Sequence, residues 1–438
     1  MVLATMAGIY LLFVGFGVLL IPLPQLAGGL ANTLQRVTFL TAVYAMLVLA
    51  LNLHWGYTGL FNIGVAGFMA VGVYTMAILT NPPSASPPGL GVPGAVAAAL
   101  PVAPGVGHFL GLLLAVVLGM VAAGVVGALA ALPALRLKAD YLAIVTIALS
   151  EIIRLSLLST TLQTFTVFGV ELGTGAGRGI GLPTNPVRAI YYVDPTDTTA
   201  GLTAVGDVLF GLFETIGISS SVVISWTYTW FIIGVVAAFY WLLVRIGNSP
   251  FGRVLKAIRE DEEVAQSLGK DTRVVKVKVF MVGCALMGLA GILWEGSKGF
   301  TDPTSTTFLP LQTFYIFIAL IIGGAGSNTG SVLGGALFAS LLFEGPTFVA
   351  RVISEYLELG TPPATFARAL GDLFGLDPVP LLAYGLEHIS SLRFVLLGVL
   401  LVFMMQRRPD GLLGHRKEEA ASVDLSARRD AAGGGGDE

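Results

Sequence analysis

Apolar residues form long runs along this chain, and polar residues are concentrated between them. A helix needs about 20 mainly apolar residues to cross a bilayer. Ten runs meet or approach this length: 3–22, 37–52, 59–80, 107–132, 140–158, 222–246, 276–297, 310–324, 331–349 and 393–407. The eighth run is short, so its depth in the membrane is left open. The pattern predicts an all-α polytopic membrane protein with about ten transmembrane helices.

The composition excludes several other classes of protein. Of the 438 residues, 55% are apolar and 12% are charged, whereas soluble domains carry about 25% charged residues. Residues 37–135 contain no Asp, Glu, Lys or Arg. A soluble enzyme or a nucleic-acid-binding protein could not cover its surface with such a sequence. The single cysteine, Cys284, excludes an intrachain disulfide and a cysteine-based metal cluster.

The distribution of Lys and Arg predicts the orientation. If both termini are cytoplasmic, 16 of the 24 Lys and Arg residues fall in inside segments. The outside loops 159–221 and 350–392 then each carry two basic and five acidic residues. Both termini are therefore predicted to be cytoplasmic.

The pattern divides the chain into three parts. Residues 1–36 are predicted to be an N-terminal transmembrane helix and an outer loop, and residues 37–414 the membrane core. Residues 415–438 are predicted to be a disordered cytoplasmic tail. Within the core, the predicted loops are 81–106, 159–221 and 350–392 outside and 247–275 inside. A Gly-Lys-Ser/Thr ending, which a nucleotide-binding P-loop requires, is absent from the sequence.

The cytoplasmic loop contains a predicted amphipathic helix over 249–269. Ser249 is suited to the N-cap, Pro250 to the first position and Gly269 to the end. The apolar face is formed by Phe251, Val254, Leu255 and Ile258. Predicted i,i+4 ion pairs are Lys256–Glu260 and Arg259–Glu263. Acidic and basic residues balance in this loop, which favours a protein partner over a membrane surface; a solvated connector helix is the alternative.

The same loop reads G-R-x-L-x-A-I-R-E-x-E-x-x-A-x-x-x-G from Gly252 to Gly269. Further stretches follow one family pattern in order; they are 51–75, 132–151, 323–336 and 408–414. Over about 37–414 the chain resembles the LivM-type permease subunits of branched-chain amino-acid ABC importers. It departs from that family at residues 61–64, where Phe-Asn-Ile-Gly replaces a common Ser-Leu-Gly-His. This departure leaves the cargo open.

The resemblance implies a non-catalytic permease in the plasma (inner) membrane of a prokaryote, which imports branched-chain or other apolar amino acids by alternating access. It implies a second homologous permease subunit, two cytoplasmic ATPase subunits and an extracytoplasmic binding protein. ATP would be used by these partners, and no cofactor by the chain itself. The implied ATPase-coupling residues are Gly252, Arg253, Ala257, Ile258, Arg259, Glu260 and Gly269. Urea or short amides are the alternative cargo, and an ion-coupled secondary transporter is the alternative class.

Polar residues within the predicted spans are candidates for a translocation path, because such groups are costly in lipid. The candidates are Asn62, Glu151, Arg154 and Glu344. The alternative is structural: an ion pair between Glu151 and Arg154, and a hydrogen bond between helices for Glu344. Glu295 and Lys298 are predicted to reach out of a span end.

Two further groups of residues stand out in the spans. Asn52 and His54, with Asn62, are predicted to satisfy broken backbone near the third span. Gly323, Gly324, Gly326 and Gly330 are candidates for a gating turn that dips into the bilayer. Close helix packing is the alternative for these glycines.

Overall fold

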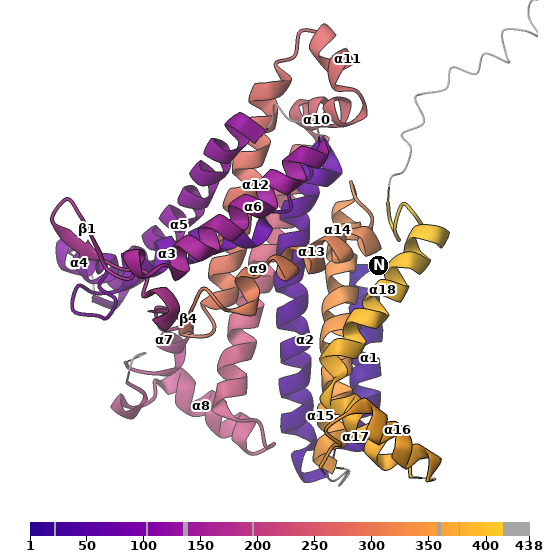
Figure 1. Ribbon diagram of the computed structural model, residues 1–438. Coiled ribbons are helices and arrows are strands. Elements are labelled where there is room, and N and C mark those ends of the chain that lie inside the picture. The colour runs from indigo at the N-terminus through magenta and orange to yellow at the C-terminus, as the bar shows by residue number, and fades with distance from the viewer. Residues whose placement is uncertain are drawn as a thin grey trace, which may run out of the picture.

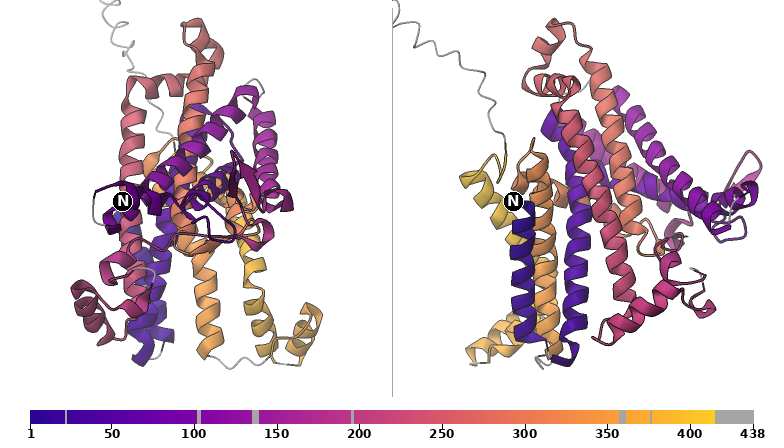
Figure 2. Two further views of the ribbon diagram at one scale, coloured as in Figure 1. Left: turned by 90° about the vertical axis from the view of Figure 1, so that its left-hand side faces the viewer. Right: turned by 180° about the vertical axis from the view of Figure 1, so that it is seen from behind.

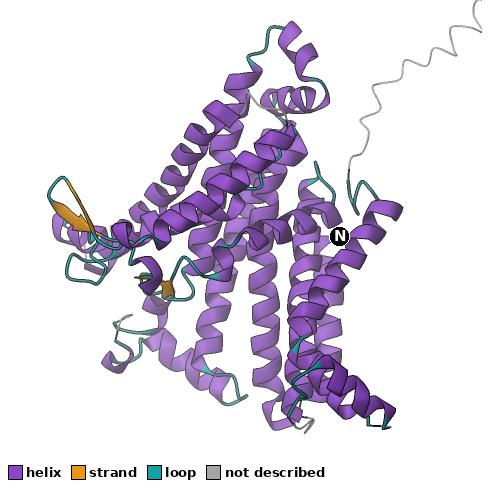
Figure 3. Ribbon diagram, viewed as in Figure 1, coloured by secondary structure: helices purple, strands orange, loops and turns teal. Residues whose placement is uncertain are grey.

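The computed structural model describes residues 1–21, 23–101, 104–134, 139–194, 197–356, 361–375 and 377–414. The predicted disordered tail lies outside these residues, as do two cations used to predict orientation, Arg136 and Lys138. The described chain is mainly helical, and Figure 3 shows the few strands confined to loops. The predicted all-α polytopic class is confirmed.

Among the described residues, six helices are long and apolar enough to cross a membrane: Leu26–Gly56, Gly105–Leu132, Tyr141–Leu158, Ser220–Asn248, Thr272–Glu295 and Asn328–Ala350. Three shorter apolar helices are Val2–Val18, Val65–Thr80 and Pro310–Gly323. Each of the ten predicted spans contains helical structure, although residues 59–64 of the third are irregular. The count of ten and the side of the termini remain predictions.

The centre of the bundle is formed by α2 (Leu23–Leu51), α3 (Val65–Thr80) and α12 (Thr272–Glu295), and α5 (Pro104–Ala134) packs on α3 and α12 with its outer face exposed. Glycines allow these helices to approach closely. A Cβ at Gly72 would lie 2.7 Å from Gly288 Cα, and a Cβ at Gly291 would lie 2.8 Å from Met69 Cβ. The face of α12 that carries Gly288 and Gly291 is therefore a packing face.

The remaining spans surround this centre. Figure 1 shows α9 (Ser220–Asn248) on one side of α2, and α1 (Val2–Leu20) with α18 (Ile389–Arg407) on the other. α6 (Ala139–Leu158) packs against α3. α13 (Pro310–Gly323) and α14 (Asn328–Leu337) form a hairpin, and α14 continues through the π-helical η6 (Phe338–Glu344) into α15 (Gly345–Tyr356).

Several predicted loops contain regular structure. Residues 23–36 belong to α2 and are not an outer loop. The predicted loop 81–106 contains α4 (Val92–Ala99), which packs on α5. The other helices of the outer loops are short: α7 (Arg188–Tyr191), α8 (Ala204–Glu214), α16 (Phe366–Phe374) and α17 (Val379–Glu387), with the 3₁₀ turns η2 (Thr160–Leu162), η3 (Ala176–Arg178), η4 (Thr198–Ala200) and η5 (Thr306–Phe308).

Two antiparallel strand pairs hold these outer loops. β1 (Phe165–Val167) pairs with β2 (Val170–Leu172), with Phe165 opposite Leu172. β3 (Ile180–Gly181) pairs with β4 (Phe300–Thr301), with Ile180 opposite Thr301. The second pair ties the long loop before α9 to the segment that follows α12.

The cytoplasmic loop forms α10 (Pro250–Glu260) and α11 (Glu262–Ser267). Figures 1 and 2 place these two helices at one end of the molecule, and α8, α16 and α17 at the opposite end. The bundle therefore presents a distinct helical projection at the end predicted to be cytoplasmic.

Candidate functional site

The projection begins as the sequence predicts. Ser249 caps α10, since its Oγ accepts a hydrogen bond from the Gly252 N–H at 3.2 Å. The single predicted helix is wrong, because Asp261 adopts an extended backbone and interrupts it. The Asp261 carboxylate caps the second helix, accepting from the Val264 N–H at 3.0 Å. Gly269 follows α11 with φ +76°, consistent with its predicted role as a helix stop.

The inner face of α10 packs on the membrane core. Gly252, Leu255 and Ile258 are buried. A Cβ at Gly252 would lie 2.4 Å from the carbonyl oxygens of Ile246 and Gly247, so the glycine permits the sharp junction with α9. This face therefore fixes the projection to the core.

The outer face of the projection is open. Arg253, Ala257 and Glu260 are exposed, and the apolar side chains of Val264 and Leu268 are 53% and 73% exposed. The residues implied to couple to an ATPase thus divide into an inner set and an outer set. The inner set is Gly252, Ile258 and Arg259, and the outer set is Arg253, Ala257, Glu260 and Gly269. Only the outer set is available to a partner.

Arg259 belongs to the inner set and does not form the predicted pair with Glu263. Its guanidinium instead donates a hydrogen bond to the carbonyl of Gly56, in the turn that follows α2. Burial lowers the pKa of Arg259, and the charge of the neighbouring Glu260 offsets this only in part. An arginine remains charged at neutral pH, so the bond is charge-assisted.

A second link anchors α11 to the first turns of α12. Glu262 accepts from Lys276 Nζ at 2.5 Å and from Thr272 Oγ1 at 3.0 Å. The projection is therefore held to the core on both sides of the break between α10 and α11.

Beneath the projection, α2 ends in a π-helical turn, η1 (Asn52–Gly56). Here the structure brings together the three polar residues predicted to satisfy broken backbone. Asn62 Nδ2 donates to His54 Nδ1 at 3.1 Å, and His54 Nε2 lies 3.2 Å from the Phe280 carbonyl of α12. This arrangement requires a neutral imidazole protonated at Nε2. Asn62 Oδ1 also accepts from the Gly64 N–H, just before α3.

The four residues predicted to line a translocation path lie in three different clusters. Asn62 is fully buried beside His54. Glu151 and Arg154 form an i,i+3 ion pair at 2.5 Å on α6, and both remain partly accessible. Glu344 is buried and pairs with Arg36 of α2 at 3.3 Å. The sequence could not indicate this last partner, which lies about 300 residues away in the chain.

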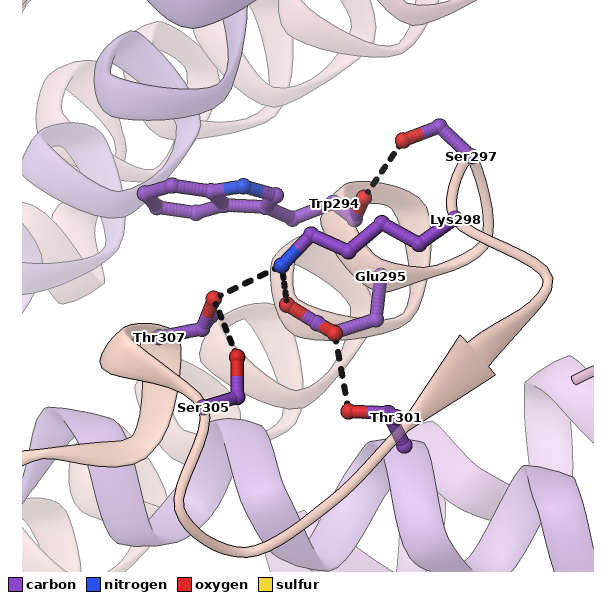
Figure 4. A network of polar contacts seen from close by, with 7 residues as sticks. All are labelled: Trp294, Glu295, Ser297, Lys298, Thr301, Ser305 and Thr307. Atoms are coloured by element: carbon purple, nitrogen blue, oxygen red, sulfur yellow. Dashed lines mark hydrogen bonds and ion pairs between the residues drawn. The ribbon is translucent and has the colours of Figure 1, made fainter. Parts of the chain in front are cut away.

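Lys298 is exposed at the span end, but Glu295 does not reach out as predicted. Figure 4 shows Glu295 within a polar network, accepting from Lys298 Nζ at 2.6 Å and from Thr301 Oγ1 at 2.8 Å. Lys298 also donates to Thr307 Oγ1 at 3.2 Å. Glu295 is fully buried, because β4 and η5 fold back over the end of α12.

The candidate gating glycines lie where α13 turns into α14. A Cβ at Gly323 would lie 2.0 Å from the Gly330 carbonyl oxygen, so the two helices cross in direct backbone contact. Gly324 and Gly326 have φ values of +101° and +90°, which only glycine adopts readily. The predicted helix–turn–helix is therefore present, and its glycines serve close packing.

A segment from the end of the core, residues 408–414, binds this turn. The Leu412 and Leu413 N–H groups donate to the carbonyls of Ile322 and Gly323 at 2.9 and 3.0 Å. Gly324 and Gly411 touch, since a Cβ at Gly411 would lie 2.5 Å from Gly324 Cα. Two separate stretches of the family pattern therefore form one structure.

Two threonines of α6 and α13, which bind the backbone at the start of α3, were not identified from the sequence. Thr146 Oγ1 accepts from the Ile63 N–H at 2.9 Å, and Thr313 Oγ1 accepts from the Ala66 N–H at 3.2 Å. Both lie in apolar runs, where a single threonine does not indicate a functional or structural role. They satisfy backbone groups exposed by the irregular segment between η1 and α3.

Comparison with known proteins identifies the family. Residues 33–350 match the family described as branched-chain amino acid transport system / permease component. The high-affinity branched-chain amino acid transport system permease protein LivM of Escherichia coli (strain K12) is 31% identical over 312 residues. That match covers 69% of this chain and 61% of the length of the relative.

Two further relatives extend the comparison. The probable branched-chain amino acid transport permease protein LivM of Methanocaldococcus jannaschii is 25% identical over 381 residues, covering 85% of this chain and 90% of the relative. The permease protein LivH of Escherichia coli (strain K12) is 31% identical over 96 residues, 22% of this chain and 30% of the relative. No solved structure matches the chain.

The family match extends over most of the chain, and the described residues include several helices long and apolar enough to cross a membrane. This is a multi-pass protein of the inner membrane. It belongs to the family of branched-chain amino acid transport system permease components.

Proposed function

We propose that the chain is a non-catalytic transmembrane subunit of an ATP-driven importer that moves branched-chain or other apolar amino acids into the cytoplasm by alternating access. It would work with a second homologous permease, two cytoplasmic ATPase subunits and an extracytoplasmic binding protein. The LivM and LivH relatives are named as components of branched-chain amino acid transport systems. ATP would bind only to the partners.

The observation that carries this proposal is the two-faced projection formed by α10 and α11. Its inner face is fixed to the core, and its outer face combines Arg253, Ala257 and Glu260 with two exposed apolar side chains. A surface with mixed charge and isolated apolar side chains suits a groove on a protein. A lipid surface would favour a basic helix. The projection is therefore the proposed docking surface for an ATPase.

The proposed substrate path follows α6. Among the four predicted path residues, Glu151 and Arg154 are partly accessible, whereas Asn62 and Glu344 are buried in packing contacts. The same helix exposes Tyr141, Ile144, Ile152 and Leu155. A second permease placed against this helix would enclose the Glu151–Arg154 pair, which offers both signs of charge to an amino acid.

An ion-coupled carrier is the other candidate class. It would need an intramembrane carboxylate that exchanges a proton or cation during transport. Glu151, Glu295 and Glu344 each pair with a basic residue. This pairing favours the importer over the carrier.

The test is transport in proteoliposomes that contain the chain with its partner permease, ATPases and binding protein. Uptake of labelled leucine and labelled urea is compared with and without internal ATP. The docking variant is Ala257→Arg, which adds bulk and charge at the exposed centre of α10. The matched control is Ala204→Arg, at an exposed position of α8 at the opposite end.

ATP-dependent leucine uptake, with ATPase retention lost in Ala257→Arg and kept in Ala204→Arg, is the expected result. Urea uptake in place of leucine uptake would keep the importer and change its cargo. Uptake that needs an ion gradient, no ATP and no intact α10 surface would refute the importer and favour the carrier.

A further inference from the structure

The side chain of Asn52, the first residue of η1, joins two elements that are distant in sequence. Its Oδ1 accepts a hydrogen bond from the Gly326 N–H at 2.7 Å, and its Nδ2 donates to Asn328 Oδ1 at 3.1 Å. Asn52 is fully buried. Buried bonds of this kind resist breaking, because a lost partner leaves an unsatisfied polar group. Asn52 therefore fastens the α13–α14 turn to the end of α2.

Gly56, four residues later, is in contact with both sides of this arrangement. Its carbonyl accepts the hydrogen bond from Arg259 of α10. A Cβ at this position would lie 1.8 Å from Asn52 Oδ1 and 2.6 Å from the Gly326 nitrogen. One short turn of backbone thus separates the projection from the hairpin. We call Asn52, Gly56, Arg259, Gly326 and Asn328 the η1 junction.

The projection has other connections to the core, and one of them also leads to the hairpin. Gly252 packs on the end of α9, and Tyr240 of α9 shares a 2.9 Å hydrogen bond with Thr329 Oγ1 of α14. Glu262 leads instead to α12. The route through η1 has a charge-assisted bond at one end and two hydrogen bonds of a fully buried side chain at the other. The α9 route has a single bond between hydroxyls, so the η1 route is the firmer connection.

We propose that the η1 junction is the joint through which movement of α10 reaches the α13–α14 hairpin. Arg259 and Asn52 are its positioning residues, and neither needs to touch substrate or ATP. This inference rests on the proposed function, since an ATPase must move α10. The new element is the path: the movement passes through η1, which follows α2, to the turn between α13 and α14.

The test measures leucine uptake and ATP hydrolysis on the same vesicles of the complete reconstituted importer. The two variants are Asn52→Ala and Arg259→Gln. Thr329→Ala is the matched control for a hydrogen bond of α14 that does not involve η1. Arg273→Gln is the matched control for loss of a cation at an exposed position of α12.

Both variants are expected to assemble and hydrolyse ATP at nearly the parental rate. Leucine uptake per ATP should fall about tenfold, as expected for the loss of buried or charge-assisted hydrogen bonds. Both controls should keep the parental ratio. Arg259 is only partly buried, so Arg259→Gln is the deciding variant if Asn52→Ala fails to assemble.

If Arg259→Gln kept the parental leucine uptake per ATP, the proposed joint would be refuted. An equal loss of uptake per ATP in Thr329→Ala would refute it as well. Either result would leave the importer itself intact, because the parent protein would still transport with ATP. Absence of ATP-dependent uptake by the parent would instead refute the proposed function and the joint with it.

Discussion

Replacing Lys298 with methionine is expected to destabilise the protein through the carboxylate that it leaves behind. Glu295 is fully buried and keeps only its bond from Thr301 once the ammonium group is gone. Loss of one partner of a buried ion pair costs about 3–5 kcal/mol. The Lys298 side chain is 40% exposed, so water can partly replace it, and we expect about 2–3 kcal/mol.

The size of this effect in a melting experiment follows from the length of the chain. Unfolding entropy is about 2.1 cal/mol/K per residue. Over 438 residues, a loss of about 2–3 kcal/mol lowers the Tm by about 2–3 °C. Tryptophan fluorescence in detergent can follow the transition, since Trp294 lies beside the network (Figure 4).

The double variant Glu295→Gln with Lys298→Met tests the reasoning. It removes both charges, and the glutamine oxygen can still accept from Thr301, so the cost should fall below about 1 kcal/mol. Lys278→Met, at an exposed position near the other end of α12, is the control for loss of a lysine. A double variant that melts as low as Lys298→Met would show that the stranded charge is not the cause.

Three further outcomes can be checked separately. Ser249→Ala should weaken the first turn of α10 by about 1 kcal/mol through loss of its cap, measured as faster amide exchange in that helix and not elsewhere. Gly283→Ala should reduce the yield of folded protein, because a Cβ there would lie 2.0 Å from His54 Nε2; Gly234→Ala, with nothing within 4 Å, should not. Trp226→Phe should lower stability by about 1 kcal/mol, because the indole N–H donates to a carbonyl of α2 at 3.0 Å; an unchanged Tm would contradict this.

The spans could be predicted from the sequence because lipid imposes long apolar runs on them. The prediction of helix boundaries failed where contacts between distant parts of the chain determine where a helix begins. Residues 23–36 contain Pro24, Gln25 and Arg36, which interrupt the apolar pattern, yet α2 includes them. Proline is tolerated in the first turn of a helix. The Arg36 side chain stays 49% exposed and pairs with the buried Glu344.

In the functional site too, features set by neighbouring residues could be predicted, and contacts between residues distant in the sequence could not. The cap at Ser249 and the stop at Gly269 depend on a few neighbouring residues and were predictable. The destination of Arg259 was not, since helical spacing favoured Glu263 while the fold supplies the Gly56 carbonyl. Hydrogen bonds between residues hundreds of positions apart, such as that of Asn52 with Asn328, leave no trace in local periodicity.

The binding of residues 408–414 to the α13–α14 turn has a consequence for the biosynthesis of the protein. Gly324 and Gly411 touch, yet the ribosome adds them 87 positions apart. At about 5–20 residues per second, the turn waits about 4–17 s for its partner. During that interval the carbonyls of Ile322 and Gly323 lack the donors they later receive. We therefore expect the hairpin to be the last part of the core to become resistant to membrane proteases during synthesis.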